Sequence, residues 1–134
     1  MKSKIVFGVA GVLFTGAALA ALAAGADLMQ GYRNAGAGPF SAEAGGSAWT
    51  RTHQSAGAAG ARSCASCHGA DPGQPGKHIE TGKPIEPMAV SVNPARLSDP
   101  EKVEKWFRRN CRWTLGRECT SQEKGDFIRY LTSQ

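Results

Sequence analysis

The sequence has few aromatic residues and few cysteines, and few large apolar side chains remain beyond its first 26 residues. Aromatic residues make up 7% of the 134 residues, and four residues are cysteines. A chain of this length forms one small domain. A hydrophobic core this small needs an additional stabilising element. We therefore expect a buried prosthetic group, a disulfide, or both.

The chain also lacks the charge excess that is typical of nucleic-acid-binding proteins. Its formal net charge is +5, and Lys2 and Lys4 lie in an N-terminal segment that we expect to be removed, which leaves about +3. No basic helix with interleaved aromatic side chains is present. The composition therefore excludes a nucleic-acid partner.

The N-terminus has the pattern of a secretory signal peptide. A short positive start, residues 1–4, precedes an uncharged apolar run that ends at Ala26, and small residues near the end of this run offer three cleavage sites. We expect residues 1–26 to be removed by cleavage somewhere in 20–26, and residues 27–134 to form the mature periplasmic domain. The alternative is an uncleaved membrane anchor, because the run is long enough to span a bilayer.

The strongest local motif is Cys64-Ala-Ser-Cys67-His68. This C-x-x-C-H spacing is typical of covalent c-type haem attachment, in which each thiol forms a thioether with one haem vinyl group. His68 then binds the iron from the proximal side. A zinc site would need two more ligands at suitable spacing, and a thioredoxin-like pair would need a strand before the motif. The sequence therefore predicts one covalent haem c with its iron, and such attachment takes place outside the bacterial cytoplasm.

The two remaining cysteines, Cys111 and Cys119, are eight positions apart. An exported chain seldom leaves two nearby cysteines unpaired. We therefore expect a disulfide, and closing this short loop would stabilise the fold by about 2–3 kcal/mol.

Apolar spacing and capping signals predict an all-α protein. Two short helices precede the motif, over residues 27–34 and 41–52. A Gly/Pro-rich segment, residues 69–94, excludes long helices and predicts a loop that wraps the haem. Two capping boxes, Ser98 with Glu101 and Thr120 with Glu123, open two final helices. This order predicts a small class I-like monohaem cytochrome c, with helices around a covalently bound haem.

The function depends on the residue opposite His68 on the iron. Asn110 lies at helical spacing from Val103, Trp106 and Phe107, which predicts a buried stripe where Trp106 contacts the haem and Asn110 needs a polar partner. The iron would provide one for the amide oxygen. The alternative is that Asn110 caps the helix end or meets water, and spacing alone does not separate the two.

Met88, on the wrapping loop, is the alternative sixth ligand, because a His/Met iron stays six-coordinate and has a raised reduction potential. His53 and His78 are expected to be solvated surface residues, and Asn93 is expected in a turn. A haem enzyme such as a peroxidase is a weaker alternative, since no distal His with a neighbouring acid is visible. Four arginines near Asn110 can pair with haem propionates, attract anions, steer an acidic redox partner, or simply be solvated: Arg108, Arg109, Arg112 and Arg117.

The stretch from residue 64 to residue 131 resembles the sphaeroides haem protein (SHP) family of small bacterial c-type cytochromes. The matching residues are Thr81-Gly82-Lys83, Ile85, Pro87, Pro94, Arg96, Val103-Glu104-Lys105-Trp106, Arg109-Asn110-Cys111, Gly116-Arg117, Cys119 and Glu123-Lys124. The resemblance implies that Asn110 binds ferric haem and leaves on reduction, so that the ferrous site binds oxygen, carbon monoxide or nitric oxide.

The same resemblance implies a Cys111–Cys119 disulfide and a redox partner such as a dihaem cytochrome c or a membrane cytochrome b. It also implies an electron-transfer or gas-binding protein rather than an enzyme, with at most minor oxygen-reducing activity. One position departs from the family, which has an aliphatic residue where this chain has Met88. A plain six-coordinate electron carrier that uses Met88 therefore stays open beside the gas-binding hypothesis.

The chemistry of the two ligands explains why their identity matters. A neutral amide oxygen is a hard, weak donor that suits Fe(III) better than Fe(II), whereas a thioether prefers Fe(II). Reduction should therefore loosen an Asn110 ligand and keep a Met88 ligand in place.

Overall fold

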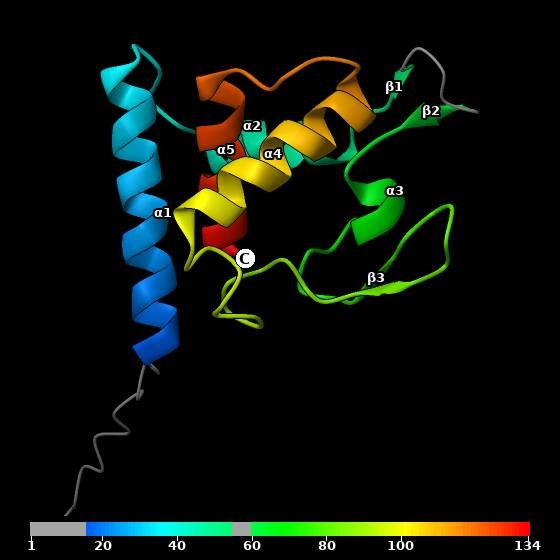
Figure 1. Cartoon of the computed structure of the whole chain (residues 1–134), viewed down its shortest axis with the longest axis horizontal. Helices are drawn as coiled ribbons and strands as arrows, with labels where there is room; N and C mark the ends of the chain where they lie inside the picture. The colour runs from blue at the N-terminus through cyan, green and yellow to red at the C-terminus, as the bar shows by residue number, and fades with distance from the viewer. Residues whose placement is uncertain (1–15, 55–59) are drawn as a thin grey trace, which may run out of the picture.

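The computed structural model describes residues 16–54 and 60–134, which form a helical protein with very short strands (Figure 1). Most of the predicted leader, residues 1–15, lies outside this described part. The elements follow one another along the chain as α1 (Gly16–Asn34), α2 (Ala42–Thr50), β1 (His53–Gln54), β2 (Ala61–Arg62), α3 (Ala65–His68), β3 (Gly76–Lys77), β4 (Pro84–Ile85), α4 (Pro100–Leu115) and α5 (Ser121–Ser133).

Helix α1 is longer than the predicted helix of residues 27–34 and runs through the region where we expect cleavage. Ala21 is fully buried in the core, and Gly25 lies against Leu97 and Ile128. No helix in residues 16–54 or 60–134 is long and apolar enough to cross a membrane. The cleavage site itself stays a prediction.

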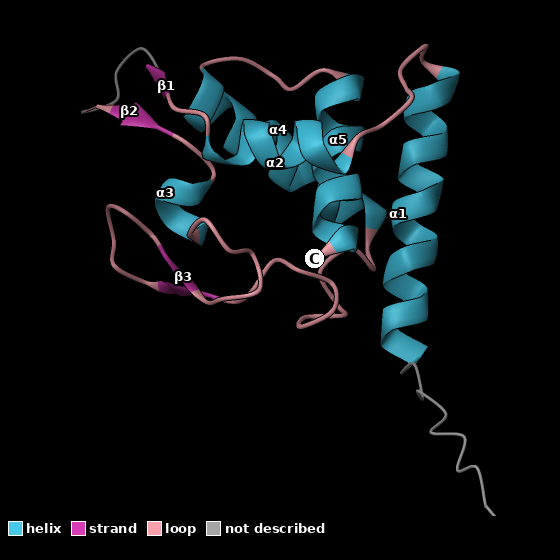
Figure 2. Ribbon diagram, turned by 180° about the vertical axis from the view of Figure 1, so that it is seen from behind, coloured by secondary structure: helices cyan, strands magenta, loops and turns pink. Residues whose placement is uncertain are grey.

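The helices α2, α4 and α5 form the centre of the molecule, and α1 stands along one side of it (Figure 2). Helix α2 packs closely on α5 because glycines remove side chains from the contact. A Cβ on Gly45 would lie 2.2 Å from the carbonyl oxygen of Asp126, and one on Gly125 would lie 2.3 Å from the Phe40 ring. Asp126 is buried and accepts a hydrogen bond of 2.8 Å from the N–H of Ser41, the N-cap of α2.

Helix α1 is joined to the rest of the core through Tyr32. Its buried hydroxyl donates a hydrogen bond to the Glu104 carboxylate of α4, and Lys124 of α5 forms an ion pair of 2.7 Å with the same carboxylate. Burial, followed by the hydrogen bond with Glu104, raises the pKa of Tyr32, so the phenol stays neutral. The three side chains thus connect α1, α4 and α5.

The capping prediction is wrong for α4 and confirmed for α5. The N-cap of α4 is Asp99, whose side chain accepts from the N–H of Lys102 at 3.0 Å. Pro100 has no N–H and occupies the first turn, so the helix begins after Asp99 rather than after Ser98. It then continues to Leu115 and stops where Gly116 takes a φ of 74°. Helix α5 has the predicted capping box of Thr120 and Glu123.

The predicted wrapping loop contains two short antiparallel strands, β3 and β4, in which Gly76 pairs with Ile85 and Lys77 pairs with Pro84. The remainder is held by turns, and Pro72 accepts hydrogen bonds from the N–H groups of Met88 and Ala89 at 2.8 and 2.9 Å. A second antiparallel pair, β1 and β2, precedes α3. Neither pair forms a layer of the core, so the fold is all-α as predicted.

The ion pair at the start of α5 should make the stability of the protein pH-dependent. The hydrogen bond from Arg117, at 2.7 Å, lowers the pKa of Glu123 from 4.5 to about 2. A lowered carboxyl pKa contributes stability above pH 4.5, and this contribution is lost as the pH falls toward 2.

We therefore expect Glu123→Gln, which can keep the capping box but not the charge, to flatten this acid-induced loss of unfolding free energy. Urea titrations at a series of pH values measure it. Glu43→Gln is the matched control, because the exposed Glu43 side chain forms no ion pair with the described residues. Equal slopes for wild type and Glu123→Gln below pH 5 would contradict the prediction.

Candidate functional site

The C-x-x-C-H motif forms α3, a helix of one turn. Cys67 is buried and Cys64 is half-buried, and both thiols are free. The helix ends at Gly69, whose φ of 77° suits a residue without a side chain. One turn therefore presents both sulfurs and the imidazole of His68, which is the arrangement that the sequence predicts for haem attachment.

The protonation states of this motif suit metal ligation by His68. Burial, with a further contribution from the positive charge of Arg96, lowers the pKa of His68 to about 4, so the imidazole is neutral at pH 7. Neutral imidazole is the form that binds a metal. Burial also raises the pKa of the Cys64 thiol to about 11. The Cys64 thiol and the His68 imidazole are thus both uncharged at pH 7.

Trp49 of α2 holds the imidazole from the core side. Its ring centroid lies 5.4 Å from that of His68, and its Nε1 donates a hydrogen bond of 2.8 Å to the Gly69 carbonyl. The His68 Nδ1 atom is buried without a hydrogen-bond partner among the described residues. Trp49 is only 4% exposed and packs with Phe127 and Leu131, so its place is the core behind His68.

The hairpin of β3 and β4 packs directly on α3. A Cβ on Gly76 would lie 2.3 Å from the Cys67 carbonyl oxygen and 2.8 Å from the His68 Cα. The N–H of Ile79 lies 3.4 Å from the Cys67 sulfur, yet the Ile79 side chain is 53% exposed. This exposed apolar side chain beside the attachment thiol offers a contact surface for a flat apolar group such as a porphyrin.

The donor set does not fit the zinc alternative. In residues 16–54 and 60–134, no three His, Cys, Asp or Glu side chains gather as they would around a metal ion. Cys111 and Cys119 form a disulfide with an S–S distance of 2.00 Å and a Cα–Cα distance of 5.5 Å. The motif therefore has the chemistry of haem attachment and lacks the extra ligands that zinc requires.

Asn110 is exposed, so the prediction of one buried stripe on α4 is wrong. The four residues of the predicted stripe lie on two neighbouring rows of the helix surface. Val103 and Phe107 lie on the row that packs into the core, followed by the buried Cys111 and Thr114. Trp106, which is 44% exposed, begins the other row, which continues through Asn110 to Trp113. Asn110 is therefore directed out of the polypeptide core together with two indole rings.

Met88 packs against the core. Its side chain is half-buried against the cluster that contains Trp49 and Phe127. Arg96 fixes the adjoining backbone, with hydrogen bonds of 2.9 and 2.6 Å to the carbonyls of Pro87 and Glu86. The same arginine lies close enough to His68 to lower its pKa. Met88 thus belongs to the side of the site that holds the imidazole.

The other three candidates lie elsewhere in the structure. His78 is half-buried, so the expectation that it is solvated is wrong: its ring centroid lies 5.8 Å from that of Trp113, and its Nδ1 accepts hydrogen bonds of 3.2 Å from the N–H groups of Glu80 and Thr81. Asn93 lies in the expected turn and donates a hydrogen bond of 3.1 Å to the Pro87 carbonyl. His53 is also half-buried, in β1, so the same expectation is wrong for it.

Several residues near the site gave no clear signal in the sequence. Arg62 precedes the motif by two positions, and its guanidinium carbon lies 3.9 Å from the centroid of the Trp113 ring. Gly76 is one glycine among 17. No local pattern marks either residue, because both act through partners that are distant in the sequence.

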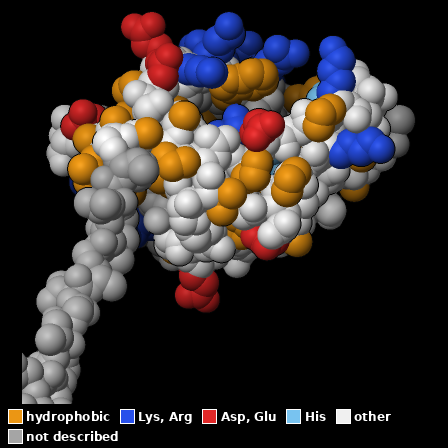
Figure 3. All heavy atoms as spheres, turned by 90° about the horizontal axis from the view of Figure 1, so that it is seen from below, with side chains coloured by type: hydrophobic (Ala, Val, Ile, Leu, Met, Phe, Trp, Pro, Cys, Tyr) orange, Lys and Arg blue, Asp and Glu red, His pale blue; other side chains and the backbone are white. Residues whose placement is uncertain are grey.

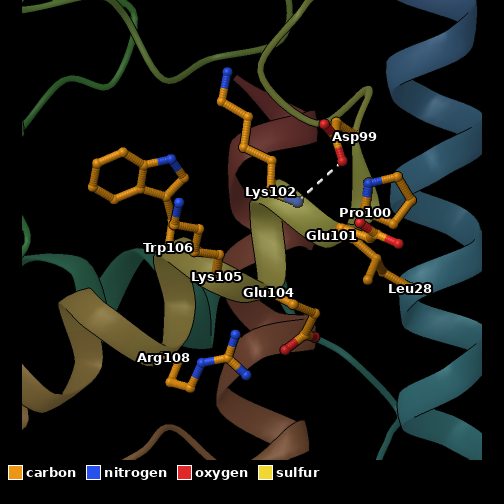
Figure 4. Close-up of a pocket in the computed structure, with 9 residues that line it drawn as sticks. All are labelled: Leu28, Asp99, Pro100, Glu101, Lys102, Glu104, Lys105, Trp106 and Arg108. Atoms are coloured by element: carbon orange, nitrogen blue, oxygen red, sulfur yellow. Dashed lines mark hydrogen bonds between the residues drawn. The ribbon is translucent and has the colours of Figure 1, made fainter.

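Two of the four arginines near Asn110 form ion pairs at the end of α4. Arg112 pairs with Glu118, and Arg117 pairs with Glu123 at 2.7 Å. Arg109 lies over the Trp106 ring, 5.4 Å from its centroid. Arg108 lines an open groove of about 810 Å³ between α1 and the start of α4 (Figure 4). This groove is lined by Leu28, by charged residues of α4 and by Trp106, and none of its lining residues belongs to the cysteine motif.

The close contact of Gly76 with α3 predicts that this position tolerates no side chain. Because the nearest atoms are backbone, Gly76→Ala should force α3 to shift and destabilise the protein by about 1–3 kcal/mol. We also expect a lower ratio of covalent haem to protein, measured by the absorbance of the pyridine complex. The control is Gly31→Ala, where a Cβ meets nothing within 4 Å. Normal haem content and stability in Gly76→Ala would show that the contact is unimportant.

Comparisons with known proteins agree with this geometry. Residues 35–131 match the family model described as Domain of unknown function (DUF1924), which covers more than half of the chain. The chain is 41% identical over 122 residues to cytochrome c-type protein SHP of Cereibacter sphaeroides, a match that covers 91% of this chain and 93% of that protein. It is 38% identical over 140 residues to cytochrome c'' of Methylophilus methylotrophus, covering 100% of this chain and 96% of the relative.

Solved structures give the same result. Oxidised SHP, described as an oxygen-binding cytochrome c, superposes with a TM-score of 0.76 at 41% identity and covers 82% of this chain and 96% of that chain. The solution structure of Methylophilus methylotrophus cytochrome c'', analysed for the basis of haem-ligand detachment, has a TM-score of 0.74 at 34% identity and covers 84% and 95%. The chain is a cytochrome c rather than an enzyme. It belongs to the DUF1924 family and is a small, all-α monohaem cytochrome c, similar to SHP and cytochrome c'', that carries one covalently attached haem c.

Proposed function

We propose that the protein is a one-electron cytochrome in which Asn110 is the sixth ligand of the oxidised iron and leaves on reduction, so that diatomic gases can bind. One observation carries this proposal. Asn110 is directed out of the core on a row that begins at Trp106 and ends at Trp113. The competing ligand, Met88, is half-buried and packs against the core cluster of Trp49 and Phe127 instead.

Helix α3 and its N-cap residue supply the haem-attachment residues. Cys64 and Cys67 are the free thiols that would form the two thioethers, and His68 supplies a neutral imidazole that Trp49 holds in place. The haem, when bound, would supply a one-electron redox couple and an iron that can bind protein and gas ligands. The exposed faces of Ile79 and Trp106 offer apolar surface for the porphyrin.

The choice of Asn110 gives the protein a redox-dependent coordination position. The amide oxygen is a weak, hard ligand that binds the oxidised metal better than the reduced one. Trp106 and Trp113 flank Asn110 on its row of the helix. Helix α4 is fixed on its other side by Val103 and by the disulfide at Cys111. Asn110 can therefore withdraw by a small side-chain movement without unfolding the helix that carries it.

Substitution of the two candidate ligands tests the proposal. We expect Asn110→Ala to convert the ferric spectrum from low spin to high spin and to leave carbon monoxide binding by the ferrous protein unchanged, because Asn110 has already left the reduced iron. Met88→Leu, which preserves the side-chain volume, should leave both spectra unchanged. Optical spectra of the ferric, ferrous and carbon monoxide-bound proteins measure these effects.

The opposite pattern would overturn the proposal. If Met88→Leu alone changed the ferric spectrum, and if reduced wild type failed to bind carbon monoxide, the protein would be a six-coordinate His/Met electron carrier. Coloured, folded Asn110→Ala protein with an unchanged ferric spectrum would likewise exclude Asn110 as a ligand.

The proposed electron-transfer partner is an acidic redox protein, which the family resemblance suggests is a dihaem cytochrome c or a membrane cytochrome b. Lys102, Lys105 and Arg109 are exposed on α4 around Trp106, and none of them forms an ion pair with a described residue. Figure 4 shows that Lys102, Lys105 and Trp106 extend away from the acidic side chains that face α1. In Figure 3, Lys and Arg side chains gather along one rim with a hydrophobic patch between them. Such a surface attracts an acidic partner.

A charged oxidant tests this surface without the natural partner. We expect the double variant Lys105→Glu/Arg109→Glu to react several-fold more slowly with ferricyanide at low ionic strength, because the anion meets repulsion near the proposed electron-transfer route. Stopped-flow oxidation of the reduced protein measures the rate. Arg129→Glu on α5, an exposed position, is the control for charge reversal. If Arg129→Glu slowed the ferricyanide reaction as much per reversed charge as the double variant does, the proposal of a localised electron-transfer surface on α4 would be contradicted.

We further propose that the protein works in the periplasm after removal of its leader. The uncharged run that ends at Ala26 and its small-residue cleavage sites support this. Covalent haem attachment outside the cytoplasm, together with the Cys111–Cys119 disulfide, fits an oxidising compartment.

A further inference from the structure

A buried arginine contacts α4 one turn beyond Asn110. The guanidinium carbon of Arg62 lies 3.9 Å from the centroid of the Trp113 ring, and its Nη2 forms an ion pair of 2.7 Å with Glu80. Arg62 is only 7% exposed, whereas the Glu80 side chain is 54% exposed. A cation over an indole face is attracted by the ring, and burial strengthens the attraction.

These three side chains come from the three segments that surround the site. Arg62 ends β2 and stands directly before Ser63 and Cys64. Glu80 belongs to the hairpin whose Ile79 N–H contacts the Cys67 sulfur. Trp113 lies on α4, three positions after Asn110. The single guanidinium therefore connects the cysteine motif, the hairpin and the ligand-bearing helix.

We propose that Arg62 is a positioning residue that holds the Asn110 row of α4 at a fixed distance from the haem-attachment segment, and so sets how readily Asn110 leaves the oxidised iron. This inference rests on the proposed role of Asn110. The rest of α4 is anchored elsewhere, by Val103 in the core and by the Cys111–Cys119 disulfide. Loss of the Arg62 contact should therefore change the local position of Asn110 and not unfold the helix.

Loss of the Arg62 contact should therefore shift the equilibrium between two states of the oxidised protein, one with Asn110 bound to the iron and one with Asn110 released from it. An added ligand such as imidazole binds only the released state, so its apparent affinity rises in proportion to the population of that state. In the reduced protein Asn110 has already left, and the Arg62 contact should have no effect on carbon monoxide affinity. A merely structural role would instead alter both affinities, or neither.

Arg62→Met tests the inference, because methionine fills a similar volume without the charge and the exposed Glu80 stays solvated. We expect imidazole to bind the ferric holoprotein about three- to tenfold more tightly, with unchanged affinity of the ferrous form for carbon monoxide. Trp113→Phe, which keeps a weaker aromatic face, should shift the imidazole affinity in the same direction by less. Arg117→Met is the control, since it removes a more exposed ion pair with Glu123.

A double-mutant cycle separates this inference from the proposed function. In an Asn110→Ala background, Arg62→Met should no longer change imidazole affinity, because the released state is already fully populated. If Asn110→Ala itself leaves imidazole affinity unchanged, the proposed ligand role fails. If Asn110→Ala raises the affinity but neither Arg62→Met nor Trp113→Phe does, the role of Asn110 stands and only the Arg62 inference is overturned. An equal effect of Arg62→Met in both backgrounds would also overturn it.

Discussion

The contact that the rest of this structure depends on is the packing of α3 between Trp49 and the β3–β4 hairpin. A helix of four residues cannot maintain its own geometry. Trp49 lies beside the imidazole and bonds to the Gly69 carbonyl, and Gly76 allows the hairpin backbone to approach within contact distance on another side. The two thiols and the imidazole are thus oriented by tertiary contacts around a local motif.

Helix α4 complements this fixed motif with Asn110, the residue that we propose as a movable ligand. One row of the helix is anchored through Val103 and Cys111, whereas the neighbouring row carries Asn110 between two indoles and away from the core. This division would suit the proposed redox-dependent site, because the backbone could stay in place while one side chain changes its partner. The Arg62–Trp113 contact lies between the Asn110 row and the segment before the cysteine motif.

The accuracy of the sequence predictions follows the range of the interactions involved. The Thr120–Glu123 capping box was predicted because it depends on residues a few positions apart. The start of α4 was misplaced by one residue, since Asp99 and Ser98 offer competing caps. The burial of Asn110 was wrong because apolar spacing identifies a broad side of a helix but not which of two adjacent rows meets the core.

By itself the sequence determined the class of protein, since the spacing of Cys64, Cys67 and His68 is chemically specific within five residues, and no other motif competes with it. Only the tertiary structure decided that Met88 packs against the core and that Asn110 faces outward. It also brought together Arg62, Glu80 and Trp113, which are separated along the chain by up to one half of its described length. The physical reason is that covalent spacing fixes what a short motif can bind, whereas the direction of a side chain depends on the distant surfaces that pack around it.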